Sequence, residues 1–402
     1  MATQKIKIIH LLHHSYSPYF DHPLKIEFRR DEWSVAVAEQ IMKHFPQKYE
    51  LECWRPEKLA KRIYEKKVNG IIHKIFPCRP QRHFGYSREI SFPLLKELSR
   101  ETKKCEQKLI IHVHGIHTYL AYAIGTLFKN IPIVGQHHGG IPKYICLRYI
   151  KKKSLYPLLY LERLWEYCSL KHFAHFFVLT KSEKEWLEGM GVSANIEIQT
   201  MGVDFELFNP MDKMEARQIL NLPPKKNILL YVGKLSSFKG VDIIINIYYS
   251  LKTKYSDRFV LILIGGNRKD PLYEKATQSG AVVLGRIPQK ELVPYYAAAD
   301  IYLLPTFHED YNGGIGMATV EAMACNTPVV ATTLKHFPSD EWTKCGKIPE
   351  TPEDVEKQIM EILENPSVFK HCREVAQIFF DWKSIIRHTV EIYERISCRI
   401  GI

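Results

Sequence analysis

The chain has 402 residues, of which 46% are hydrophobic and 25% charged, a composition typical of a soluble globular protein with more than one core. No stretch reaches the roughly 18 consecutive apolar residues that a membrane-spanning helix needs. The N-terminal apolar stretch is too short for a signal peptide, and the nine scattered cysteines include no C-x-x-C pair. These features argue against a disulfide framework or a zinc site and favour a cytoplasmic protein.

The net charge of +12 is unevenly distributed along the chain. Residues 1–210 contain 32 Lys and Arg against 21 Asp and Glu, whereas residues 211–402 contain 24 against 23. This basic excess indicates either an anionic partner of the first half or a solvated basic face without a partner. Because no nucleic-acid-binding motif accompanies the excess, we expect no nucleic-acid partner.

Hydrophobic strand-like runs alternate with helical segments along the whole chain. Their continuous Val, Ile and Leu runs suit strands that are buried on both faces, as in parallel sheets covered by helices. We therefore expect an α/β fold. The predicted strands lie at 5–12, 49–54, 109–115, 131–138, 175–180 and 196–202 in a first series, and at 227–233, 259–266, 281–287, 300–306 and 327–332 in a second.

An Asn-Pro turn, a short helix and a Pro-Pro pair between residues 205 and 227 separate the two series of strands. We therefore predict an N-terminal domain over residues 1–205 and a second domain over 206–380. A helical pattern over 381–402 predicts a C-terminal helix. In doubly wound domains of this kind ligands bind at the carboxyl ends of the strands, so functional residues should directly follow strands.

The first such turn follows the strand at 227–233. Lys234 and Lys239 lie in a short loop there, and Gly240 opens the next helix. Two cations and the loop amides at this place would neutralise a diphosphate. The alternative is a pair of surface lysines on an ordinary loop.

Two weaker signals follow the next strands. Gly265 ends the strand at 259–266 and would let the backbone approach a ligand closely. Arg286 and Ile287 end the following strand, where main-chain groups could bind the edge of a nucleobase. A plain tight turn explains either segment equally well.

A glycine-rich loop, formed by Gly313, Gly314, Ile315 and Gly316, precedes a helix whose free N–H groups and dipole favour an anion. Glu321 lies one turn further along, within an apolar run. A carboxylate is costly there unless it is bound, and we expect it to bind two vicinal hydroxyls, as on a ribose. The alternatives are a head group that reaches solvent and a structural arginine.

Histidines follow two predicted strands of the first half. His138 precedes a Gly-Gly pair and is the predicted active-site contact, because a neutral imidazole can donate to a sugar hydroxyl or stabilise developing charge. His112, His114 and His117 have a spacing that resembles a metal site. Since side chains of a buried strand alternate between opposite faces, we expect them not to share a metal.

Residues 143–173 mix Lys and Arg with Tyr, Trp and Leu. This composition is typical of an amphipathic helix that lies on an anionic membrane surface. A helix that packs its aromatic side chains into the core and points its basic side chains to water would have the same composition. The sequence leaves both open.

Together these motifs resemble the retaining glycosyltransferases of family 4, which have the GT-B fold. The resemblance spans nearly the whole chain and is strongest between residues 175 and 335, where "VGKLSSFKGVD", "LGRIPQKELVPYYAAADIYLLPT" and "VEAMACNTPVVAT" are similar to family motifs. It implies two Rossmann-like domains facing a central cleft, with the C-terminal helix crossing back to the N-terminal domain.

The resemblance also implies an activity and roles for individual residues. Lys234 and Lys239 would clamp the diphosphate, Glu321 would bind the ribose, and His138 would lie near the donor sugar. The donor would be a UDP- or GDP-sugar, and the acceptor a glycan, a lipid-linked glycan or a polysaccharide precursor held by the N-terminal domain. Transfer would retain the anomeric configuration and need no metal cofactor.

Two departures from the family pattern are visible. The family has a second glutamate eight residues before the ribose-binding one, and Gly313 stands at that position. Counted from Pro305, Glu309 takes the position instead and is the predicted catalytic carboxylate, with Asp310 as its alternative. The family also has a glycine-rich loop after the first strand, where this chain has only the hydroxyls of residues 15–17 to substitute.

Two other functions remain open from the sequence. A catalytically inactive protein that binds a nucleotide sugar would fit the altered glutamate pattern. A nicotinamide-dependent enzyme fits less well, because neither half has G-x-G-x-x-G after its first strand.

Overall fold

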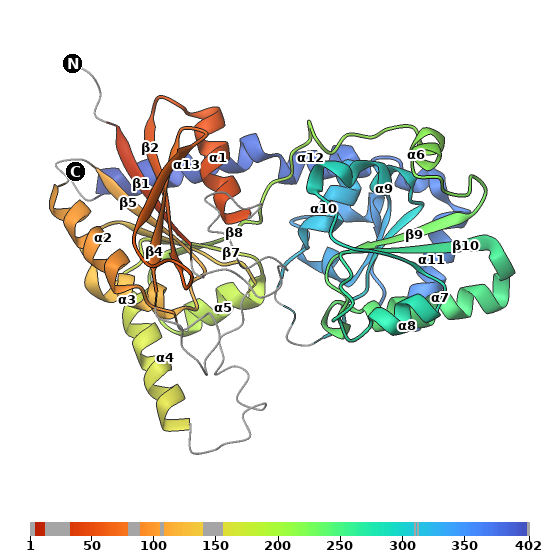
Figure 1. The fold of residues 1–402 in the computed structure, drawn as a ribbon, viewed down its shortest axis with the longest axis horizontal. Helices are drawn as coiled ribbons and strands as arrows, with labels where there is room; N and C mark the ends of the chain where they lie inside the picture. The colour runs from red at the N-terminus through yellow and green to blue at the C-terminus, as the bar shows by residue number, and fades with distance from the viewer. Residues whose placement is uncertain are drawn as a thin grey trace. The chain divides into compact units, whose positions relative to one another are not determined.

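The computed structural model describes residues 5–12, 33–78, 89–104, 108–139, 156–308, 311 and 313–399 (Figure 1). The chain forms two compact units, one of Met1–Thr200 with Lys383–Ile402 and the other of Met201–Trp382. Each unit contains a largely parallel sheet with helices packed against it, so the expected α/β fold of two Rossmann-like domains is confirmed. The units change at Met201 and Lys383, and the limits expected from the sequence lie at 205–206 and 380–381.

The first unit has an eight-stranded sheet in the order β3-β4-β2-β1-β5-β6-β7-β8. Every neighbouring pair is parallel except β3 and β4. The strands are β1 (Ile6–Leu12), β2 (Tyr49–Glu57), β3 (Tyr64–Val68), β4 (Ile71–Pro77), β5 (Leu109–His114), β6 (Ile133–Gln136), β7 (His175–Val178) and β8 (Asn195–Ile198).

The helices of the first unit are α1 (Trp33–His44), α2 (Phe92–Lys104), α3 (Tyr119–Leu127), α4 (Tyr156–Leu170), α5 (Lys181–Gly189) and α13 (Trp382–Arg399). Helix α13 is the C-terminal helix and packs on this sheet. Its Tyr393 hydroxyl lies 2.5 Å from Nδ1 of His112, and its Thr389 accepts a hydrogen bond from Gln199 at 3.1 Å. The expected return of the C-terminal helix to the N-terminal domain is therefore confirmed.

The second unit has a six-stranded parallel sheet in the order β11-β10-β9-β12-β13-β14. Its strands are β9 (Asn227–Val232), β10 (Phe259–Ile264), β11 (Val282–Leu284), β12 (Ile301–Leu304), β13 (Val329–Ala331) and β14 (Gly346–Lys347). Numbered within the unit, this is the order 3-2-1-4-5-6 of a dinucleotide-binding fold. The order reverses between β9 and β12, which is where such folds bind their ligands.

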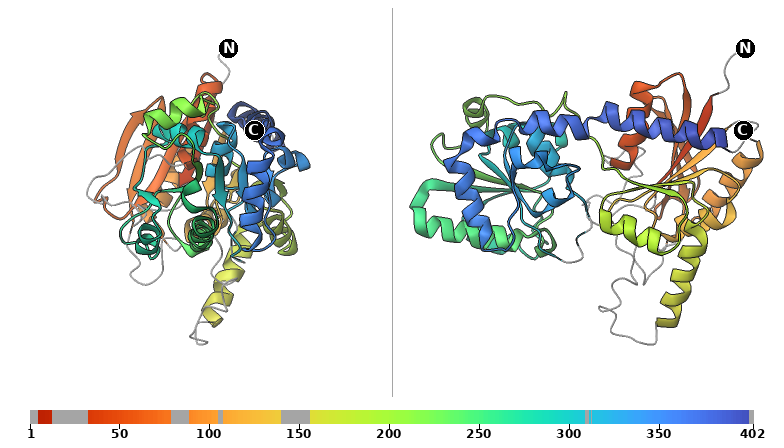
Figure 2. Two further views of the ribbon diagram at one scale, coloured as in Figure 1. Left: turned by 90° about the vertical axis from the view of Figure 1, so that its right-hand side faces the viewer. Right: turned by 180° about the vertical axis from the view of Figure 1, so that it is seen from behind.

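The helices of the second unit cover this sheet (Figure 2). They are α6 (Lys213–Ile219), α7 (Val241–Tyr255), α8 (Tyr273–Gln278), α9 (Val293–Ala298), α10 (Met317–Ala324), α11 (Asp354–Glu364) and α12 (Cys372–Phe380). The core is formed by the continuous apolar strands, since Ile228, Leu229 and Leu230 of β9 are each at most 1% exposed. No helix among the described residues of either unit is long and apolar enough to cross a bilayer.

Candidate functional site

The residues predicted from the second series of strands lie at one edge of the sheet of the second unit. They follow the carboxyl ends of parallel strands: Lys234 and Lys239 follow β9, Gly265 follows β10, Arg286 and Ile287 follow β11, and Gly313, Gly314, Ile315 and Gly316 follow β12. The segments after β9 and β12 flank the point where the strand order reverses. This edge is therefore the candidate site.

The turn after β9 is held in place by the end of β12. A short 3-10 helix, Ser237–Lys239, carries Lys239 and ends at Gly240, whose φ of 73° is left-handed. The Thr306 hydroxyl donates to the Phe238 carbonyl oxygen at 2.7 Å. This bond fixes the segment that carries Lys239 relative to the neighbouring strand end.

Lys239 is a half-buried cation in this turn. Its Nζ lies 4.4 Å from the centroid of the Tyr311 ring. Burial lowers the pKa of Lys239 from 10.5 to about 8, and no carboxylate of the described residues offsets that shift. Among the described residues this ammonium has no counter-charge, and an anionic ligand would supply one.

Lys234, the other predicted member of the clamp, has an exposed side chain. Its carbonyl oxygen accepts a hydrogen bond from the Tyr231 hydroxyl at 2.8 Å, which orders the backbone after β9. The two lysines are therefore in different environments. Lys239 is half-buried, and Lys234 lies at the surface.

Glu321 lies in α10 and is 6% exposed. Its carboxylate oxygens accept hydrogen bonds from Gln289 Nε2 at 2.7 Å and from the Tyr296 hydroxyl at 2.8 Å. Burial raises the pKa of Glu321, and these two donors oppose that shift. From the sequence, we expected solvent, an arginine or a ligand to satisfy the Glu321 carboxylate. In the structure two uncharged side chains donate to it. Each oxygen keeps a lone pair for a ligand hydroxyl.

The glycine-rich loop turns the chain sharply into α10. Gly314 and Gly316 have φ values of 60° and 79°, which favour glycine, and Gly316 is the residue that caps the helix. Ile315 between them is 1% exposed and anchors the loop in the core. The loop therefore presents the N-terminal end of α10 at the edge of the sheet.

Gly265, Arg286 and Ile287 are the remaining predicted residues of this edge, and two of them pack against the protein itself. A Cβ atom on Gly265 would lie 2.6 Å from the carbonyl oxygen of Gly233, so the close backbone contact there is between two neighbouring strand ends. Ile287 packs against the core, whereas the side chain of Arg286 is exposed.

Three residues of this edge were missed from the sequence. Tyr311 lies between Glu309 and the glycine-rich loop and was given no role from the sequence, yet it packs against Lys239 and Phe238. Gln289 and Tyr296 come from the segment after β11 and from α9, and only their contact with Glu321 reveals them. Glu309, Asp310 and residues 15–17 lie outside the described residues.

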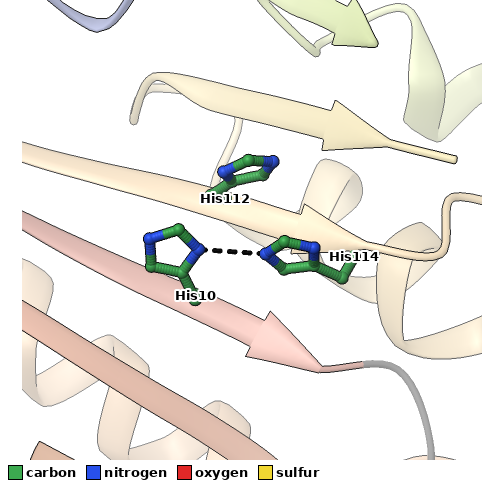
Figure 3. A group of neighbouring side chains, drawn as sticks. All are labelled: His10, His112 and His114. Carbon is green, nitrogen blue, oxygen red and sulfur yellow. Dashed lines mark hydrogen bonds between the residues drawn. The ribbon is translucent and has the colours of Figure 1, made fainter. Parts of the chain in front are cut away.

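In the first unit, His138 follows β6 and is half-buried. Its Nε2 lies 2.9 Å from Nδ1 of His114, and Nε2 of His114 lies 2.9 Å from Nδ1 of His10 (Figure 3). His10 comes from β1 and His114 from the adjacent strand β5. A chain of hydrogen-bonded imidazoles therefore joins the buried sheet to the predicted active-site histidine.

The expectation that His112 and His114 point to opposite faces is wrong. Residues two apart on a strand share a face, and the two rings stack with centroids 4.4 Å apart and 20° between their planes (Figure 3). His117 lies after the end of β5 and belongs to another cluster.

Nitrogen atoms of His10, His112 and His114 lie within 4.8 Å of one another, which is close enough for a shared ion. However, the lone pair of an imidazole nitrogen lies in the plane of its ring. Because the rings of His112 and His114 are stacked, their lone pairs lie in nearly parallel planes and do not converge on one metal ion. Burial lowers the pKa of His10 to about 3, and it lowers that of His112 well below the ordinary value. These are neutral, hydrogen-bonding rings.

A second buried cluster surrounds His117. Its Nδ1 donates to Glu166 at 2.8 Å and its Nε2 to Glu183 at 3.2 Å, and His137 also pairs with Glu183. Burial by itself would lower the pKa of His117, but the two carboxylates outweigh it and raise the value to about 9. Both ring nitrogens of His117 are thus engaged by carboxylates, and the cluster ties the loop after β5 to helices α4 and α5.

Two family profiles match the chain. The one described as "Glycosyltransferase Family 4" matches residues 34–207, and the one described as "Glycosyl transferases group 1" matches residues 212–378.

Curated relatives share parts of the sequence. A sulfoquinovosyl transferase of Arabidopsis thaliana is 26% identical over 350 residues, 82% of this chain and 63% of the relative. A D-inositol 3-phosphate glycosyltransferase of Catenulispora acidiphila is 32% identical over 146 residues, 33% of either chain. The matched parts thus span less than two thirds of these relatives' own length.

Solved structures share the fold. The sucrose-phosphate synthase of Thermosynechococcus elongatus superposes with a TM-score of 0.72 and 18% identity over 98% of this chain and all of that one. The Anabaena protein HepE, solved in complex with UDP, gives a TM-score of 0.68 and 15% identity over 97% of this chain and all of that one.

Proposed function

Because the chain belongs to family 4 of the glycosyltransferases, with the GT-B fold, we propose that it transfers a sugar from a nucleotide diphosphate sugar to an acceptor bound by the first unit. The observation that carries this proposal is Lys239, a half-buried ammonium that no described carboxylate neutralises. A diphosphate bound where the strand order reverses would supply the missing charge.

The other residues of this edge complete a donor site. The N-terminal end of α10, presented by Gly314 and Gly316, would add N–H groups and a positive dipole for the second phosphate. Glu321, already held by two neutral donors, would accept two hydrogen bonds from the ribose hydroxyls. The main chain at Arg286 and Ile287 would bind the base. The donors to test are therefore UDP-sugars and GDP-sugars.

We propose transfer with retention of configuration. The bond between the anomeric carbon and the diphosphate oxygen breaks while the bond to the acceptor oxygen forms on the same face of the sugar. The acceptor proton passes to the departing phosphate oxygen. Lys234, Lys239 and the α10 amides stabilise the negative charge that grows on the diphosphate, so that no divalent metal is required.

Two residues would bind the transferred sugar itself. His138 follows β6 and would donate a hydrogen bond to a sugar hydroxyl. Glu309, or Asp310 beside it, would take the place of the family's first glutamate. Substituting each carboxylate by its amide, singly, identifies which of the two supports transfer.

We propose that the acceptor has a lipid anchor, because helix α4 could hold the enzyme at a membrane surface. This helix buries polar side chains and exposes large apolar ones. Its buried face includes Glu166 and Ser169, whereas Tyr160, Leu161 and Leu164 are 70%, 59% and 48% exposed and lie on one face of the helix. The helix also projects from the body of its unit (Figure 2). In the sequence, three lysines stand at 151–153, with two residues between them and the start of the helix at Tyr156. An exposed apolar helix face, preceded in the sequence by a run of lysines, suits the surface of an anionic bilayer.

Vesicle flotation tests the membrane contact. The protein should float with vesicles that contain phosphatidylglycerol, and serine substitutions at Leu161 and Leu164 should abolish flotation. Leu127 is 61% exposed at the end of α3, and Leu127→Ser is the matched control that should bind as wild type does. Equal flotation of all variants would contradict this role of α4.

A donor panel tests the activity. UDP- and GDP-sugars are incubated with lipid-linked acceptors, with EDTA and with magnesium, and the anomeric proton of the product is followed by NMR. We expect transfer from one nucleotide series, with retention and without an effect of EDTA. Lys239→Ala should lower turnover at least a hundredfold, whereas Lys335→Ala, at an exposed lysine of the same unit, should not. Nucleotide binding without turnover on any acceptor would instead favour an inactive nucleotide-sugar-binding protein.

A further inference from the structure

The chain of His10, His114 and His138 has the geometry of a line of N–H···N hydrogen bonds. Both N···N distances are 2.9 Å. The ring centroids are 5.2 Å apart in each pair, and the planes differ by 25° and 11°. Rings that are nearly parallel and joined through such short nitrogen contacts meet edge to edge. Each contact therefore holds one proton between two imidazoles.

The number of protons in the line restricts its tautomers. Three neutral imidazoles carry three ring protons, and the two contacts use two of them. The third must lie at one end, on Nε2 of His10 or on Nδ1 of His138, because a mixed arrangement would leave His114 with no proton or with two. Burial lowers the pKa of His10 to about 3, which keeps the buried end neutral.

The buried end decides between the two arrangements. His10 is 0% exposed, and its Nε2 has no hydrogen-bond partner among the described residues. A proton placed there would be a buried N–H without an acceptor, which is rarer in proteins than an unpaired acceptor. The arrangement with Nδ1–H on all three rings avoids this.

We propose that His10 and His114 are positioning residues that hold His138 as the tautomer with its proton on Nδ1. His10 Nδ1–H donates to His114 Nε2, and His114 Nδ1–H donates to His138 Nε2. The other ring nitrogen of His138 is then a donor and not an acceptor. His112, stacked on His114 and bound to Tyr393, keeps the middle ring in its rotamer.

The consequence for the ligand rests on the proposed function. With its proton on Nδ1, His138 donates a hydrogen bond from this nitrogen to a sugar hydroxyl oxygen. The proton of that hydroxyl must then point away from His138. Which nitrogen of a histidine carries the proton is set by the bond of the other nitrogen, and here that bond comes from His114. Without it, Nε2 of His138 loses the donor that keeps it unprotonated, and the equilibrium shifts toward the Nε2–H tautomer.

Two variants whose side chains have the same number of heavy atoms and the same branching at Cγ test the proposal. His114→Asn keeps an N–H donor where Nδ1 lies, and His114→Leu removes it. With histidine ring nitrogens labelled with ¹⁵N and His138 assigned by its loss in His138→Gln, long-range ¹H–¹⁵N spectra identify the protonated nitrogen. We expect protonated Nδ1 in wild type and in His114→Asn, and a shift toward protonated Nε2 in His114→Leu.

Protonated Nε2 of His138 in wild type, or identical spectra of the Asn and Leu variants, would overturn the proposal. If His114→Leu does not fold, His10→Leu and His10→Asn form a second pair with the same expectation. In the transfer reaction, His114→Leu should lower kcat/KM at least tenfold and His114→Asn should restore most of it. If wild type neither binds nor transfers a donor sugar, the proposed function fails, while the spectra still decide the tautomer.

Discussion

Gly240 lies directly against the carbonyl oxygen of Pro305, so closely that a Cβ atom on Gly240 would overlap it. The turn after β9 and the end of β12 are therefore in backbone contact at the point where the strand order reverses. Lys239 immediately precedes this contact. Its position is thus set by main-chain packing rather than by the flexibility of a surface loop.

Substitution of Gly240 by alanine should destabilise the second unit. The left-handed φ of 73° and the overlap with Pro305 both oppose a side chain, and we expect a loss of roughly 2 to 5 kcal/mol in the free energy of unfolding by urea. Gly285→Ala is the matched control, because nothing lies within 4 Å of its added Cβ, and it should change stability by less than about 1 kcal/mol. Equal stability of both variants would mean that the contact is not tight.

Glu321→Gln should affect binding more than stability. The pKa of Glu321 is raised in the fold, so its ionisation costs stability as pH rises above the unfolded value, and the neutral amide avoids that cost. Gln289 and Tyr296 can hydrogen-bond to an amide as well. We expect the free energy of unfolding at pH 7 to stay within about 1 kcal/mol or to rise, while the Kd for the nucleotide increases at least tenfold. A large loss of stability with unchanged affinity would make Glu321 a structural residue.

The positions of most strands along the chain, and the residues that follow their carboxyl ends, could be inferred from the sequence, because continuous apolar runs and the glycines after them are local signals. One local signal was overlooked. Asn69-Gly70, with φ values of 50° and 84°, forms the turn between β3 and β4, and such a dipeptide is a strong hairpin signal.

Other features of the site depend on contacts between distant segments. The partners of Glu321 lie 25 and 32 residues away, and no spacing rule connects them. The histidine chain requires β1 and β5 to be adjacent, with His10 paired to His112 in register. A single sequence contains no information on that pairing, so the chain became visible only in the structure.

The stability of the first unit should fall as pH rises from about 6.5 to 9. The pKa of His117 is raised to about 9 in the fold, so its contribution is fully present below the unfolded value of 6.5 and is lost through pH 9. The shift corresponds to roughly 3 kcal/mol at most. Thermal unfolding across this range should give a steeper decline for wild type than for His117→Gln. Parallel pH profiles would contradict a protonated His117 between Glu166 and Glu183.

Calorimetric titration with UDP and GDP in EDTA, at pH 8 and in two buffers of different ionisation enthalpy, tests the central claim most directly. Lys239 has a pKa of about 8 without ligand, and a bound diphosphate should raise it. Binding of one nucleotide should therefore take up about half a proton, and its affinity should fall above pH 8. Lys239→Arg should bind without proton uptake, because arginine stays charged. Binding with no linked proton in wild type, or with the same affinity in Lys239→Ala, would contradict a diphosphate site built on Lys239.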